Sequence, residues 1–274
     1  MNQSIYELSK NKSLSVIVPF FKGAEKVQEN IEILENELGR YFSNYEIIAV
    51  ADNGKDETYQ KILELKNTYP QLKIYEYGCN RGKGFALKYG FEKSKGDYII
   101  FIDGDMNLHP KDIKAFLGLM DIYDVDAVIG SKRHPQSEVN YPLLRRFLSR
   151  GYQLFIRMFL DVNVSDTQVG LKLFKRKVLE NSLPRVLIKK YAFDLELLTV
   201  ANHLGYKKIL EAPIELNYSY STKEFWLKDC IRILKMTWPM FVDTLAIIYR
   251  LRILKYYDKI SAKGFNNYSG QKSQ

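Results

Sequence analysis

Two aspartates, Asp103 and Asp105, stand two residues apart and are the groups in this sequence best suited to hold a cation. Asn107 follows after two more residues, and carboxylate and amide oxygens are ligands that Mg²⁺ and Mn²⁺ prefer in proteins. Gly104 between the aspartates would let a ligand approach the backbone closely. A lone pair of this kind is also typical of a solvated acidic turn, so the metal hypothesis depends on the surrounding segments.

The segment directly before these residues, 98–101, holds four apolar residues and predicts a buried parallel strand. Open α/β sheets bind their ligands at the carboxyl ends of such strands. Further strand-like runs at 14–19, 45–50 and 72–77 alternate with segments of helical period, of which the first is 24–41. This alternation predicts an α/β fold with a doubly wound, mostly parallel sheet flanked by helices.

Polar residues also follow the second and third predicted strands. Asp52 ends the second strand, and a turn containing Arg81 and Lys83 follows the third. This turn has neither the spacing of a P-loop nor the third glycine of a dinucleotide-binding fingerprint. We therefore expect a metal to hold any bound phosphates, with Arg81 and Lys83 adding positive charge.

The net charge of +9 is concentrated in one part of the chain, because residues 131–191 carry 13 basic and 4 acidic side chains. Such an excess indicates a surface for an anionic partner: phosphate, anionic lipid or nucleic acid. No RNA- or DNA-binding motif is recognisable, which disfavours the nucleic-acid alternative. Two cysteines and three scattered histidines show no metal-ligand spacing, so neither a zinc site nor a disulfide framework is expected.

Two stretches combine basic with bulky apolar residues, at 143–160 and 225–238. This composition is typical of helices that lie in the headgroup plane of a membrane, although an amphipathic core helix is the alternative for each. No segment approaches the ~20 apolar residues needed to span a bilayer, and the polar start of the chain is unlike a signal peptide. The expected organisation is an extension at 1–12, a catalytic domain at 13–220, interfacial helices at 221–258 and a flexible tail at 259–274.

Several short motifs occur together in one order. Five of them resemble the family-2 inverting glycosyltransferases of GT-A fold: the strand at 14–19, the turn at 52–58, NRGKG at 80–84, GDY at 96–98 and DGD at 103–105. Four more resemble the branch of dolichyl-phosphate mannose and glucose synthases: GSK at 130–132, RRFLS at 145–149, DTQVGLKLF at 166–174 and FDLELL at 193–198. The likeness covers residues 13–220 and implies a nucleotide-sugar half at 13–130 and an acceptor half at 131–220.

The resemblance implies an enzyme that moves a hexose, glucose or mannose, from UDP-glucose or GDP-mannose to a polyprenyl or dolichyl phosphate at the cytoplasmic membrane face. It implies Mn²⁺ or Mg²⁺ as cofactor, a peripheral or monotopic location, and leaves open a membrane-protein partner. Its metal ligands would be Asp103, Asp105 and Asn107. The donor would contact seven residues: Pro19, Phe20, Asp52, Lys83, Asp103, Gly104 and Asp105.

A phosphate acceptor is already largely ionised at pH 7, so it needs a cationic cradle more than a strong base. The candidates for this cradle are Lys132, Arg133, Arg145 and Ser149, of which the last two lie one helical turn apart. If the acceptor were instead a sugar hydroxyl, Asp194 or Glu196 would be the natural base, Asp194 first; otherwise the two would order the acceptor loop or pair with basic residues. The candidate catalytic residues are therefore Asp105, Asp194 and Arg145.

The sequence departs from the family pattern at three places. Lys22-Gly23 replaces the usual asparagine and glutamate, Ala51 replaces the first of two paired aspartates, and Lys132 replaces an arginine. Lysine keeps the charge of arginine but lacks its bidentate fork. These departures leave the donor base open and keep an inactive scaffold as an alternative.

Overall fold

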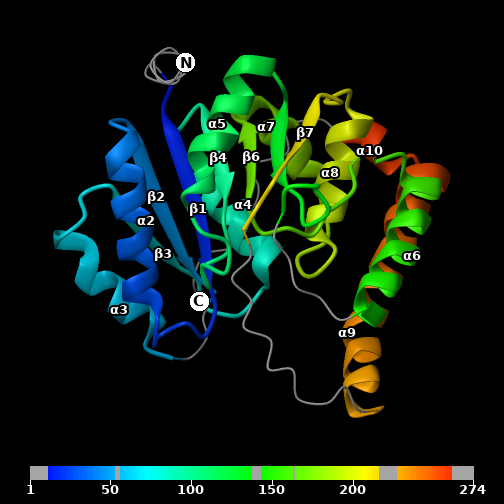
Figure 1. Cartoon of the computed structure of the whole chain (residues 1–274), viewed down its shortest axis with the longest axis horizontal. Coiled ribbons are helices and arrows are strands. Elements are labelled where there is room, and N and C mark those ends of the chain that lie inside the picture. The colour runs from blue at the N-terminus through cyan, green and yellow to red at the C-terminus, as the bar shows by residue number, and fades with distance from the viewer. Residues whose placement is uncertain (1–11, 53–55, 138–142, 163, 216–226, 261–274) are drawn as a thin grey trace.

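The computed structural model describes residues 12–52, 56–137, 143–162, 164–215 and 227–260, with only the backbone described at 143–150 and 227–237. One sheet of seven strands runs through the molecule in the order β3-β2-β1-β4-β6-β5-β7 (Figure 1). All neighbouring strands pair in parallel except β6, which is antiparallel to both β4 and β5. The predicted α/β class with a mostly parallel sheet is confirmed. The strands are β1 (Leu14–Phe20), β2 (Tyr45–Ala51), β3 (Leu72–Glu76), β4 (Tyr98–Phe101), β5 (Ala127–Gly130), β6 (Lys172–Lys175) and β7 (Ile209–Ala212).

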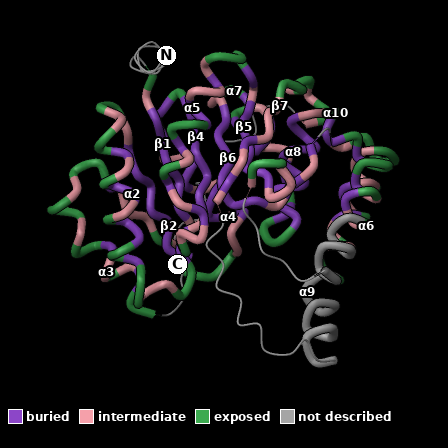
Figure 2. The backbone as a smooth tube through the Cα atoms, viewed as in Figure 1, coloured by how far each residue is buried: buried purple, intermediate pink, exposed green. Residues whose placement is uncertain are grey.

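The central strand β4 is buried on both faces, as its continuous apolar sequence predicts. Ile99 and Phe101 belong to one hydrophobic cluster, and Tyr98 and Ile100 to the other, because successive side chains of a strand point to opposite faces. Figure 2 shows the resulting buried layer along the strands. Helices α4 (Lys83–Lys93), α7 (Arg176–Ser182) and α8 (Phe193–His203) contribute to the first cluster, and α2 (Val27–Tyr41) and α5 (Asp112–Tyr123) to the second.

The two expected halves of the catalytic domain share this one sheet. Strand β6 comes from the second half, yet it pairs with β4 and β5 of the first half. Short connecting helices complete the domain, namely α3 (Thr58–Glu64), η2 (Leu65–Asn67) and η3 (Leu183–Arg185). The site described below is therefore built from segments of both halves.

Four helical segments form the end of the molecule beyond α8: α6 (Leu143–Leu160), α9 (Leu227–Ile248), the π-helix η4 (Tyr249–Ile253) and α10 (Tyr256–Lys259). The Tyr152 and Thr244 hydroxyls lie 2.7 Å apart, and the Phe155 and Phe241 rings are 5.4 Å apart, so α6 and α9 pack side by side (Figure 1). No helix in the described ranges combines the length and the apolar content needed to cross a bilayer.

Several predicted boundaries differ from the observed ones. The first helix begins at Val27 rather than at residue 24, and β3 ends at Glu76. Helix α9 continues through Pro239 for nine residues, and it lies within the 221–258 region where interfacial helices were expected. Lys259 belongs to α10, so the expected tail at 259–274 is shorter by at least that residue. Residues 1–11 and 261–274 lie outside the part of the chain that the structure describes.

A methyl group at Gly90 would overlap the Ile17 side chain, whereas nothing lies within 4 Å of one at Gly151. We therefore expect Gly90→Ala to destabilise the protein by about 1–3 kcal/mol through overpacking of the α4–sheet contact. Gly151→Ala should instead be neutral or gain up to about 1 kcal/mol of helix propensity, since Gly151 is an exposed residue of α6. Urea unfolding measures the free energy of unfolding of each variant. Equal changes in the two variants would contradict this account of α4 packing.

Candidate active site

The Asp103–Asp105 turn lies at the carboxyl end of β4 and is fixed by the end of β1. A methyl group at Gly104 would come within 2.7 Å of the Pro19 carbonyl oxygen and 2.6 Å of the Phe20 ring. The Asn30 amide of α2 donates to the Gly104 carbonyl at 2.8 Å. This close approach requires glycine at position 104, and it places the predicted donor residues Pro19 and Phe20 directly beside the acidic turn.

Four charged side chains of alternating sign run inward from this turn. Lys83 Nζ lies 2.6 Å from Asp103 Oδ1 and 3.6 Å from Asp194 Oδ2, and Lys172 Nζ lies 2.7 Å from Asp194 Oδ1. The outer pair is about one third exposed, while the Lys172 side chain is 1% exposed. Lys172 also donates to the Val169 carbonyl. The structure thus brings together Lys83, Asp103 and Asp194 from three distant sequence motifs.

The two lysines determine the charge of Asp194. Burial alone would raise the pKa of its carboxyl group, but Lys172 and then Lys83 lower that pKa below the ordinary value. Burial likewise opposes the charge of Lys83, yet Asp194 and Asp103 raise the pKa of Lys83. Asp194 is therefore an ionised group with a lysine at each oxygen. This arrangement disfavours the alternative in which it acts as general base.

Asp105 and Asn107 close the turn on its outer side. Asp105 Oδ1 accepts from the Asn107 amide N–H at 3.1 Å, and Asp105 Oδ2 accepts from Asn107 Nδ2 at 2.6 Å. Partial desolvation raises the pKa of the exposed Asp105, and the nearby Asp103 charge raises it further. A divalent cation would relieve this repulsion, and the donors are hard oxygens, so the turn suits Mg²⁺ or Mn²⁺.

Protein side chains supply only part of such a coordination shell. Within the described ranges, no three His, Cys, Asp or Glu residues are grouped to hold a metal ion. The two aspartates would therefore need further ligands, for which the Asn107 amide and substrate oxygens are suited. Lys83 Nζ now occupies one oxygen of Asp103, so a cation would share that carboxylate with the lysine.

Asp52 directly follows β2, as predicted, and its carboxylate is used in backbone hydrogen bonds. It is 3% exposed, and its two carboxylate oxygens accept from the backbone N–H groups of Arg81 and Gly82, each at 2.8 Å. Gly82 has a φ of 90°, which favours glycine. Asp52 thus fixes the turn before α4, and the exposed Arg81 guanidinium lies 4.6 Å from the Phe85 ring centroid.

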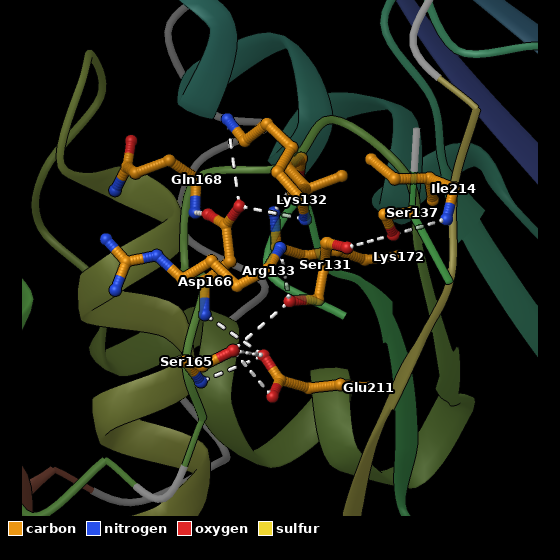
Figure 3. Close-up of polar contacts among 11 residues, drawn as sticks. Ser131, Lys132, Arg133, Ser137, Ser165, Asp166, Gln168, Lys172, Glu211 and Ile214 are labelled. Atoms are coloured by element: carbon orange, nitrogen blue, oxygen red, sulfur yellow. Dashed lines mark hydrogen bonds and ion pairs between the residues drawn. The ribbon is translucent and has the colours of Figure 1, made fainter. Parts of the chain in front are cut away.

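The predicted acceptor residues Lys132 and Arg133 lie in a polar network beyond β5 (Figure 3). Lys132 donates its backbone N–H to Asp166 Oδ2 at 3.2 Å and keeps its ammonium group 3.8 Å from the same oxygen. Glu211 of β7 accepts from the backbone N–H groups of Ser165 and Asp166 at 2.8 and 3.0 Å. Arg145 and Ser149 are part of α6, but their side chains lie outside the described ones.

The segment 166–170 joins the acceptor side to the donor side. Asp166 contacts Lys132 at one end, and a methyl group at Gly170 at the other end would overlap the Asp103 carboxylate. Between them, the buried Thr167 Oγ1 and Gln168 Nε2 atoms have no hydrogen-bond partner among the described residues. Buried polar groups normally have one, so water or a polar ligand would satisfy these two atoms.

Lys172, Thr167 and Gln168 lie in the DTQVGLKLF motif, but no chemistry was predicted for them from the sequence. A signal for Lys172 was present, because a lysine between Leu171 and Leu173 in a strand must be exposed or paired. Nothing in the sequence indicated that its partner is Asp194.

Comparisons with known proteins agree with this geometry. Residues 15–183 match the family described as "Glycosyl transferase family 2". The chain belongs to that family. A dolichyl-phosphate beta-glucosyltransferase of Dictyostelium discoideum is 28% identical, with 81% of this chain and 74% of that protein aligned. A dolichyl-phosphate beta-glucosyltransferase of Trichomonas vaginalis is 30% identical over 74% of this chain and 65% of its own length.

Solved structures confirm the GT-A type of fold for this family 2 member. Glucosyl-3-phosphoglycerate synthase of Mycobacterium tuberculosis, solved with Mn²⁺ and UDP-glucose, superimposes with a TM-score of 0.63 at 15% identity over 88% of this chain and 82% of that one. Mannosyl-3-phosphoglycerate synthase of Rubrobacter xylanophilus gives a TM-score of 0.63 at 15% identity, covering 95% and 81% of the two chains.

Lys172→Met should leave the buried Asp194 carboxylate with only the more distant Lys83. We expect a loss of about 3–5 kcal/mol in the free energy of unfolding, the usual cost of removing one partner of a buried ion pair. Lys172→Met/Asp194→Asn should recover part of that loss. Lys175→Met is the matched control, because Lys175 ends the same strand and pairs with the exposed Asp124, so about 0–1 kcal/mol is expected. Similar losses for the two single variants would contradict the importance of the inner pair.

Proposed function

We propose that this family 2 member is an inverting hexosyltransferase that moves glucose or mannose from a nucleotide diphosphate sugar to a polyprenyl phosphate of the dolichyl type. The observation that carries the proposal is the acidic turn at Asp103 and Asp105, placed beside Lys83 and joined through 166–170 to the basic side at Lys132. The Dictyostelium and Trichomonas relatives, which are named as dolichyl-phosphate beta-glucosyltransferases, support the lipid acceptor and favour glucose as the sugar.

A divalent cation at this turn would be held by Asp103 and Asp105, with Asn107 as a further ligand. Bound there, it would supply Lewis-acid stabilisation of the negative charge that accumulates on the departing nucleoside diphosphate. The Mycobacterium neighbour, which contains Mn²⁺ with UDP-glucose, supports Mn²⁺ or Mg²⁺ as the cofactor. Lys83, held between Asp103 and Asp194, would add a fixed positive charge on the same side.

In this proposal the donor binds beside the acidic turn, where Pro19 and Phe20 pack closely against Gly104. Asp52 contributes indirectly. Its carboxylate accepts a hydrogen bond from the Arg81 backbone N–H and so positions the turn that carries Arg81. UDP-glucose and GDP-mannose are both candidate donors.

On the acceptor side, Lys132 and Arg133 would attract the lipid phosphate, together with Arg145 and Ser149 of α6. The acceptor needs no strong base since a phosphate monoester is ionised at pH 7. The pairing of Asp194 with two lysines fits this mechanism better than transfer to a glycan hydroxyl. Arg145 in this scheme binds the reacting phosphate, and Asp105 acts through the cation.

The apolar face of the helical end is suited to a membrane surface, and we propose that it binds the cytoplasmic face peripherally. Large apolar side chains are exposed on consecutive turns of α6, α9 and η4: Leu154, Met158, Phe159, Trp238, Val242, Leu245, Tyr249 and Ile253. Exposure reaches 67% at Met158 and 68% at Ile253. Large apolar side chains that are exposed on several turns of helices with basic residues are typical of interfacial binding.

The activity test combines purified protein, Mn²⁺, a short polyprenyl phosphate and labelled UDP-glucose or GDP-mannose. We expect a labelled product that extracts into organic solvent. Asp105→Asn should lower kcat by about 100-fold or more, because a metal contributes several kcal/mol to transition-state stabilisation. Asp161→Asn is the control: Asp161 is exposed, and its φ of 50° suits asparagine. No transfer with either donor, or full activity of Asp105→Asn, would refute the proposal.

Membrane binding is tested separately by co-sedimentation with vesicles containing anionic lipid. Leu154→Ser/Met158→Ser/Ile253→Ser should reduce the bound fraction about tenfold or more, because each change removes apolar surface that would leave water on binding. Activity on a water-soluble short-chain acceptor should persist. Leu63→Ser/Ile122→Ser/Tyr123→Ser changes three exposed apolar residues elsewhere and should leave binding intact. If both triple variants bind alike, the helical end is not the membrane-binding surface.

A further inference from the structure

Glu196 is a fully buried carboxylate that the proposed chemistry does not use. Its Oε2 atom accepts from the backbone N–H groups of Leu187 and Ile188 at 2.9 and 2.7 Å. Its Oε1 atom accepts from Arg250 Nη2 at 2.8 Å and from the Tyr257 hydroxyl at 2.7 Å. The side chain is 0% exposed, so these four bonds replace its hydration completely. One carboxylate thus joins the segment just before α8 to two C-terminal residues that lie 54 and 61 positions further along the chain.

The segment 186–189 is fixed at each of its residues. Lys88 Nζ donates to the Val186 carbonyl at 2.8 Å, and Glu196 accepts from the next two backbone N–H groups. The Lys189 carbonyl then accepts from the backbone N–H of Gly84 at 2.8 Å. A methyl group at Gly82 would come within 2.7 Å of the same carbonyl oxygen. The segment therefore packs directly against the Gly82–Gly84 turn, with no side chain between them.

Lys83 is the residue between these two glycines, and its ammonium group lies against Asp103. The segment 186–189 therefore fixes the backbone of Lys83 from one side, and Asp52 holds the preceding residues of the turn from the other. Both Asp194 and Glu196 belong to α8, but Asp194 faces the active site whereas Glu196 faces the C-terminal segments. Figure 1 shows α8 lying between the sheet and the helices α6 and α10.

The C-terminal partners of Glu196, Arg250 and Tyr257, are themselves held by further hydrogen bonds. Tyr257 of α10 is 1% exposed, its hydroxyl also accepts from Arg250 Nε at 3.2 Å, and its carbonyl accepts from Arg185 Nε at 3.0 Å. Arg250 lies in η4, directly after α9 and next to the exposed apolar face described above. A continuous series of hydrogen bonds therefore links this face to the turn that carries Lys83.

We propose that Glu196 is a positioning residue that couples the C-terminal helices to Lys83 and the Asp103 carboxylate. It acts through the segment 186–189 and does not touch substrate. The effect on donor binding rests on the proposed function, whereas the effect on the segment itself does not. Loosening the C-terminal contacts of Glu196 should therefore weaken donor binding without removing any group from the active site.

Tyr257→Phe tests this coupling, since it removes one bond to Glu196 and preserves the ring. Hydrogen exchange should become about tenfold faster at the Leu187, Ile188 and Gly84 amides. The KM for the nucleotide sugar should rise several-fold, with a smaller change in kcat and in the KM for the acceptor. The matched control is Tyr152→Phe, which loses a bond to Thr244 between α6 and α9 but has no bond to Glu196.

Each outcome separates the coupling from the proposed function. Unchanged exchange at all three amides in folded Tyr257→Phe would overturn the coupling, as would equal changes in Tyr152→Phe. Faster exchange without a change in donor KM would overturn the link to Lys83. A wild-type protein that is inert with every donor but shows the exchange effect would support the coupling and refute the proposed function. If Tyr257→Phe does not fold, Arg250→Lys tests the same link.

Discussion

The alternation of charge from Asp103 through Lys83 and Asp194 to Lys172 is the constraint on which the active-site region depends. Each inner group is too deeply buried to remain charged alone, and each is stabilised by a neighbour of opposite sign. The four residues come from the end of β4, the start of α4, the start of α8 and the start of β6. Their pairing therefore requires the sheet and both helices to be correctly placed, and a change in any one position alters the charge balance at the acidic turn.

The fold was predictable where the sequence carries a local pattern. Strand β4 is a continuous apolar run, and β1 and β2 are apolar apart from Ser15 and Glu46, so their burial on both faces follows from that composition. Strand β6 is only four residues long and has lysine at both ends, so it shows neither a continuous apolar run nor a clear alternation. Its antiparallel insertion between β4 and β5 depends on long-range pairing, which periodicity does not reveal.

The candidate site was predictable to a similar extent. The aspartates of the DGD motif were found because their spacing and their place after a strand are local features. Resemblance singled out Asp52, but its carboxylate accepts from backbone groups at residues 81 and 82, a role that no side-chain pattern indicates. Glu196 shows the same limit, because its partners lie 8 and 9 residues before it and 54 and 61 residues after it. Sequence reasoning identifies groups capable of chemistry more readily than the groups that hold them.

The antiparallel β6 also has a consequence for biosynthesis. As the chain leaves the ribosome, β4 and β5 are complete by residue 130, but the strand that must separate them is finished only at residue 175. Until then both strands present unpaired edges, which can bind each other or another chain. Closure of the sheet must therefore wait for a contact of high sequence separation, which slows folding and lengthens the period of exposure to aggregation. Nascent chains that stall between these two points should be substrates for chaperones.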